Sequence, residues 1–191
     1  MDHGTELFLG AGYGIADKIE ATVRIPALIQ VKFQALGESR VKADAGNFAL
    51  ATTLGVGYES HKSKTDSAFG PKIAQSVQNN LKETLVDFAL IAGIRPAKEF
   101  MFYGGPFIST TNVSGTAEYV TPNSTVDYSG TIISKGGNLG LEFSNAGFQV
   151  RFEGALAHVS MGSLSKSQAR VGFLLAYNFL PFPDYQDKEE D

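Results

Sequence analysis

Large apolar side chains recur at every second position along most of the chain, which is the period of a β-strand. In one clear example, Phe148 and Phe152 alternate with Gln149 and Arg151. The same alternation predicts strands over 7–15, 19–25, 29–35, 48–58, 85–94, 99–108, 138–143, 148–160 and 169–179. The predicted fold class is therefore all-β, and each strand has one apolar face and one small or polar face.

The segments between these strands alternate between two lengths. The short ones are 16–18, 95–99 and 144–147, and the long polar ones, rich in Ser, Thr, Asn and Gly, are 59–84, 109–130 and 161–168. In an antiparallel up-and-down sheet, the short turns then share one rim and the long loops share the other. That asymmetry is typical of transmembrane β-barrels.

One long loop is predicted to contain a helix, over residues 70–85. Pro71 occupies a favourable first helical position, and Ile73, Val77 and Leu81 follow at a spacing of four residues. A single apolar stripe of this kind predicts a helix that rests on a rim of the barrel.

The less apolar faces carry charges of both signs among many Gly, Ala and Thr residues. We predict that these charges form an interior polar network, made of Glu20, Arg24, Lys32, Glu142, Arg151, Glu153 and Arg170. Asp87 has the same phase on its strand. Charges inside a narrow barrel must pair, because an isolated buried charge is costly to desolvate.

Aromatic residues favour the membrane arrangement over a soluble, lipocalin-like barrel with its apolar face inside. Several aromatics lie near the short-turn rim: Tyr13, Phe48, Phe100, Phe102, Phe143, Phe148, Tyr177 and Phe179. Membrane barrels carry such aromatic girdles at the lipid–water interface. A soluble carrier of a small apolar ligand is kept as an alternative.

The amino-acid composition argues against several other classes of protein. The chain has no cysteine and a mild net charge of −4, with no basic stripe, so we expect no disulfide and no nucleic-acid partner. No run approaches the ~18 apolar residues of a membrane helix. The histidines show no metal-ligand spacing, and no metal or other cofactor is expected.

The chain resembles small bacterial outer-membrane β-barrels over nearly its whole length. Its last strand is similar to the C-terminal signal read by the barrel-assembly machinery, on Gly172, Leu175, Tyr177 and Phe179, after Arg170. This resemblance implies the bacterial outer membrane as the location, a removed signal peptide, and lipid and lipopolysaccharide as surroundings. We expect a single barrel domain over 1–180 and an acidic disordered tail over 181–191.

The number of strands is left open by the pattern. Reading 16–18 as a turn gives nine strands, whereas bacterial barrels of this class usually have an even number. Because the apolar phase stays on odd positions from 7 to 25, one long strand there would give eight, which we favour. A missing partner strand would give ten.

One pair of residues suggests chemistry. His158 and Ser160 share a face and resemble the active site of outer-membrane lipid A deacylases, in which histidine is the base and serine the nucleophile. That family continues with Asn-Ala, whereas Met161 and Gly162 follow here, and no acid lies between Ser160 and Phe182.

A non-enzymatic function is therefore expected first. The filled interior of a narrow barrel argues against a general porin. The long loops would then serve surface interaction, adhesion or envelope support. A lipid-modifying hydrolase that uses His158 and Ser160 is the alternative.

Overall fold

The computed structural model describes residues 9–16, 18–25, 28–38, 44–68, 74–119, 124–145 and 148–177. Its strands are β1 (Leu9–Ala16), β2 (Ile19–Ile25), β3 (Leu28–Leu36), β4 (Phe48–Ala68), β5 (Ala74–Ala97), β6 (Phe100–Tyr119), β7 (Ser124–Asn145), β8 (Phe148–Met161) and β9 (Leu164–Tyr177). The described part of the chain contains no helix that is long and apolar enough to cross a membrane.

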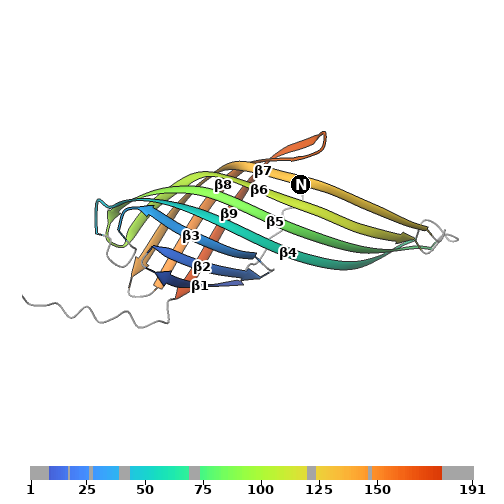
Figure 1. Ribbon diagram of the computed structural model, residues 1–191, viewed down its shortest axis with the longest axis horizontal. Helices are drawn as coiled ribbons and strands as arrows, with labels where there is room; N and C mark the ends of the chain where they lie inside the picture. The colour runs from blue at the N-terminus through green and yellow to red at the C-terminus, as the bar shows by residue number, and fades with distance from the viewer. Residues whose placement is uncertain are drawn as a thin grey trace, which may run out of the picture.

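The nine strands form one antiparallel sheet in which each strand pairs with its neighbours in sequence, from β1 to β9. The all-β, up-and-down prediction is thereby confirmed. The sheet curls, so that β1–β3 lie in front of β7–β9 in one view (Figure 1). Within the described residues β1 and β9 are edge strands with no pairing between them.

The single long strand predicted over 7–25 is wrong, because this segment is the hairpin of β1 and β2. Tyr13 pairs with Ala21, and the register then shifts between Gly14 and Ala16 at the turn. Because odd positions pair with odd positions across this hairpin, the apolar phase is the same on both strands. The phase alone therefore could not distinguish one strand from two.

The helix predicted over 70–85 is also wrong where the segment is described, because β5 begins at Ala74. Residues 70–73 lie outside the described residues. Val77 and Leu81 are four residues apart, and a spacing of four keeps residues on one face of a strand as well as on one face of a helix. An apolar helix face would also include the positions three and seven residues after Val77. These positions are Asn80 and Thr84, which are polar.

The long loops are replaced by strands. β4–β5 and β6–β7 continue as hairpins far beyond the ends of β3 and β8, and β8 turns directly into β9 at Gly162 and Ser163. The result is a four-stranded region that projects from the curled body (Figure 1). We call this region the polar extension; it comprises 58–68, 74–84, 112–119 and 124–131.

The two faces of the body differ in polarity. One face contains the most buried polar side chains, among them Thr53, Glu142 and Gln149 at 5%, 4% and 4% exposure, and we call it the inner face. The other face, here called the outer face, exposes large apolar side chains such as Leu156 and Val171, at 71% and 91%. The sheet is thus polar on its protected side and apolar on its exposed side.

Candidate functional site: outer band, inner pairs and polar extension

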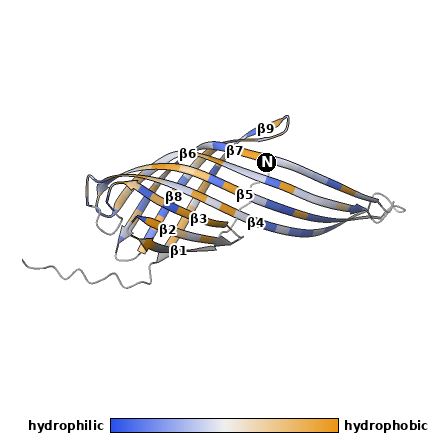
Figure 2. Ribbon diagram, viewed as in Figure 1, coloured by the Kyte–Doolittle hydropathy of each residue, from blue (hydrophilic) through white to orange (hydrophobic). Residues whose placement is uncertain are grey.

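The outer face of the body carries a continuous apolar band. In β5 it includes Val86, Phe88, Leu90 and Ile94, all of them exposed. The band continues in register across its neighbours, where Val86 pairs with Val56 and Phe88 with Ile108. Figure 2 shows the apolar colour over the strands of the body and a paler, more hydrophilic colour over the projecting strands.

Aromatic rings lie at one end and in the middle of this outer band. Phe100 and Phe143 pair at the end nearest the β5–β6 turn, with ring centroids 5.1 Å apart. Phe152 and Phe173 stack across β8 and β9 at 4.9 Å. Tilted pairs at these distances pack favourably beyond the area they bury.

The other end of the band is marked by a polar row. Lys135 of β7 pairs with His158 of β8, and His158 pairs with Ser167 of β9. The next pairs toward the body are apolar or small, with Gly137 opposite Leu156. Polar outer-face residues therefore begin at a common level on these three strands.

The inner face of the body is organised by pairs of polar side chains, the strongest of which joins β7 and β8. Glu142 and Arg151 are directly opposite each other, and the Arg151 Nε donates to Glu142 Oε2 at 2.8 Å. The Glu142 side chain is 5% exposed. Removing one partner of so buried a pair would leave the other charge without compensation, which is costly.

A second inner-face pair spans three strands. Tyr103 of β6, Gly140 of β7 and Glu153 of β8 form one row, and the Tyr103 hydroxyl donates to Glu153 Oε2 at 3.0 Å. A Cβ atom on Gly140 would lie 2.3 Å from the Tyr103 ring. Because Gly140 has no side chain, the Tyr103 side chain can extend across β7 and reach Glu153 on β8.

A second contact of this kind, in which a glycine lies between two polar residues, occurs on the inner face of β3, β4 and β5. Gln30 of β3, Gly55 of β4 and Asp87 of β5 form a row, and Gln30 Nε2 donates to Asp87 Oδ2 at 3.1 Å. A Cβ atom on Gly55 would collide with the Asp87 carboxylate. Tyr103 and Gln30 were missed by the sequence reasoning, although a polar residue, a glycine and an acid on three successive strands could have indicated both contacts.

The remaining charged residues of the predicted network differ in the contacts they make. Lys32 and Glu20 are opposite each other on β3 and β2, with an N–O distance of 3.5 Å. Glu20 also interacts electrostatically with Arg151, although β2 and β8 are far apart in the sheet order. Arg170 is exposed on β9 and donates to Gln168 Oε1 at 3.4 Å, and the side chain of Arg24 lies outside the described residues.

Arg95 is a further inner-face residue that the sequence reasoning assigned only to a turn. It is 5% exposed near the end of β5. Its guanidinium donates to the Lys98 carbonyl at 2.7 Å and lies 3.9 Å from the Met101 sulfur. Its backbone also bonds with Gly46 and Asn47, so Arg95 ties the β5–β6 turn to the connection before β4.

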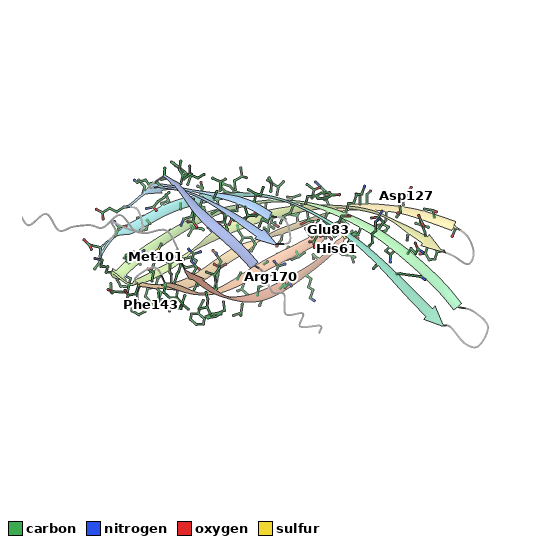
Figure 3. All side chains as sticks on the ribbon, turned by 90° about the horizontal axis from the view of Figure 1, so that it is seen from below. His61, Glu83, Met101, Asp127, Phe143 and Arg170 are labelled. Atoms are coloured by element: carbon green, nitrogen blue, oxygen red, sulfur yellow. The ribbon has the colours of Figure 1, made fainter. Side chains whose placement is uncertain are left out.

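The faces reverse their polarity in the polar extension. Leu81, Val113 and Val126 continue the phase of the inner face, whereas the outer face carries Lys82 and Asp127. An open hollow of about 400 Å³ lies there, lined by Asn80, Lys82, Ser114, Gly115, Thr116, Asp127, Tyr128 and Ser129. Figure 3 shows Asp127 on the projecting strands, at the opposite end of the molecule from Phe143.

His158 and Ser160 share the outer face, just beyond the band. The Ser160 hydroxyl donates to the Ile133 carbonyl at 3.5 Å. The residues opposite His158 are Lys135 and Ser167, so neither cross-strand neighbour is an acid. Glu153 is on the inner face, where it accepts from Tyr103.

The residues of the predicted assembly signal lie at the end of β9. Gly172 and Leu175 are in the strand, Tyr177 is its last residue, and Phe179 lies outside the described residues with the tail 181–191. In the described ranges, no group of three or more His, Cys, Asp or Glu residues is arranged to hold a metal ion.

Comparison with known proteins adds no relative. No protein-family model matches the chain, and no curated protein or solved structure is significantly similar to it.

Proposed function

We propose that this protein is an integral β-barrel of the bacterial outer membrane and a non-enzymatic surface protein whose contacts are made by the polar extension. The observation that carries the proposal is the apolar outer band. In β5 and β8 it extends over residues 86–94 and 148–156. A membrane-spanning strand needs about 9–11 residues, which matches this length.

The sidedness of the sheet favours the membrane over the soluble carrier. A lipocalin-like barrel would protect its apolar face and expose its polar one. Here Glu142 and Gln149 are protected, and Leu139 and Val171 are exposed. Exposure of so much apolar surface on one face would cause aggregation in water, whereas lipid would cover it.

Closure of the sheet into a barrel is part of the proposal, because an open edge in lipid leaves backbone groups without partners. Nine is an odd number, so β1 and β9 run in the same direction and would pair in parallel. An antiparallel closure would require a tenth strand. The charge interaction between Glu20 and Arg151 supports an approach of the inner faces of β2 and β8.

A filled interior supports a role outside transport. The paired residues Glu142, Arg151, Tyr103 and Glu153 occupy the inner face, and a narrow barrel is filled by such side chains. The polar extension would then present its outer face to partners as a surface for interaction, adhesion or envelope support. The lipid-hydrolase alternative lacks support at His158, which has Lys135 and Ser167 opposite it.

The proposed surroundings are the lipids and lipopolysaccharide of the outer membrane. The barrel-assembly machinery would bind the last strand, which includes Gly172 and Leu175. Both residues lie on an edge strand of the described sheet, where a strand-pairing partner has access to the backbone.

We expect the purified chain to fold from urea in the presence of phosphatidylcholine vesicles or detergent, and only there. Folding would appear as β-sheet circular dichroism together with a shift in gel mobility between unheated and heated samples. Planar-bilayer recordings of the same sample should show no steady conductance. A monodisperse folded monomer in detergent-free buffer would contradict the proposal.

A further inference from the structure

A patch of hydrogen-bond donors lies directly above the apolar band on β7, β8 and β9. We call it the donor patch; it consists of Lys135, His158, Ser160, Ser165 and Ser167. These residues are paired in register and are exposed or half-buried. The patch contains an ammonium, an imidazole and hydroxyl groups, which are the groups that bind a phosphate.

Lys135 and His158 have no counter-ion in the described part of the chain. Neither makes an ion pair or a hydrogen bond with another described residue. Side chains directly opposite on antiparallel strands have Cβ atoms about 5 Å apart, so one phosphate could contact both.

A shallow, open apolar hollow lies below the donor patch, on these three strands and on Phe102 of β6. It has a volume of about 390 Å³, and its lining includes Leu139, Phe152, Gly154 and Val171. Gly154 is four residues from His158 along β8, which corresponds to about 13 Å of extended strand. A Cβ atom on Gly154 would have no atom within 4 Å, so the hollow is open at this residue.

We infer that the donor patch and the hollow together bind one anionic phospholipid, with its phosphate on Lys135 and His158 and an acyl chain beside Gly154. The inference depends on the proposed membrane location. The hollow selects a lipid over free phosphate, because an inorganic ion would make no use of an apolar surface below the patch. It also gives the His158–Ser160 pair a binding role that needs no acid.

The test uses the full chain folded in neutral phosphatidylcholine nanodiscs, titrated with phosphatidic acid while the His158 side-chain NMR signal is followed. Lys135→Gln should weaken binding about fivefold, which corresponds to about 1 kcal/mol per cation at a membrane surface. Gly154→Leu, which fills the hollow, should also weaken phosphatidic acid binding. Lys166→Gln is the matched control, because Lys166 precedes Ser167 on β9 and lies on the opposite face.

Two outcomes would overturn the inference while the proposed function stands. One is equal weakening by Lys135→Gln and Lys166→Gln, which would indicate general charge attraction. The other is a response to inorganic phosphate as strong as that to phosphatidic acid, with no effect of Gly154→Leu. Failure of the wild-type chain to enter nanodiscs would instead overturn the proposed membrane location, and the inference with it.

Discussion

Replacing Glu142 by alanine is expected to lower the free energy of unfolding by about 3 kcal/mol, because it leaves the Arg151 guanidinium without its partner on the inner face. The two groups are 2.8 Å apart, and Glu142 is almost fully buried. Urea titration of the protein folded in vesicles, followed by circular dichroism, measures the change.

Two further variants show whether the loss comes from the pair. Glu118→Ala removes an exposed acid of the polar extension and should change stability by less than about 0.5 kcal/mol. Leucine at both Glu142 and Arg151 should recover most of the loss, because an apolar pair leaves no unpaired charge behind. A Glu142→Ala variant as stable as Glu118→Ala would show that the ion pair does not support the sheet.

Leu139→Arg is expected to destabilise the protein folded in vesicles by about 2–4 kcal/mol, which is typical of a cation on the lipid face near the middle of a bilayer. Leu139 is 77% exposed on the outer face, within the apolar band. No packing contact of comparable size is lost with an exposed side chain, so the cost would come from its surroundings. The same urea titration measures it.

Thr131→Arg provides the matched control on the same strand and face. Thr131 is exposed in the polar extension, beyond the level of Lys135. Arginine there should change stability by less than about 0.5 kcal/mol, since the side chain meets water. Equal effects of the two substitutions would indicate that no lipid covers Leu139.

Period-two alternation was sufficient to predict the all-β, antiparallel fold and the separation of the two faces. It failed where a helix and a strand would show the same spacing of apolar residues. Val77 and Leu81 have the spacing of a helix face and also that of a strand face, and only the pairing of β5 with β4 and β6 decides between them. In the polar extension, the abundance of Ser, Thr and Asn resembled loop composition, although long hairpins tolerate these residues when their outer face meets water.

The inner contacts were predictable only in part. Glu20 with Lys32 and Glu142 with Arg151 are direct cross-strand neighbours, but their partners depend on a register that the sequence does not contain. Tyr103 reaches Glu153 because Gly140 lies between them, so the contact depends on which three strands are adjacent. The position of Lys135 opposite His158 could not be predicted for the same reason.

The central claim is that lipid covers the outer face of the body and ends below the donor patch. The chain has no cysteine, so single spin labels can be placed at Phe152, Leu156 and Ser160 of β8 without background labelling. In vesicles, we expect high oxygen and low nickel-chelate accessibility at Phe152 and Leu156, with the reverse at Ser160. Nickel-chelate accessibility at Phe152 and Leu156 as high as at Ser160 would contradict it.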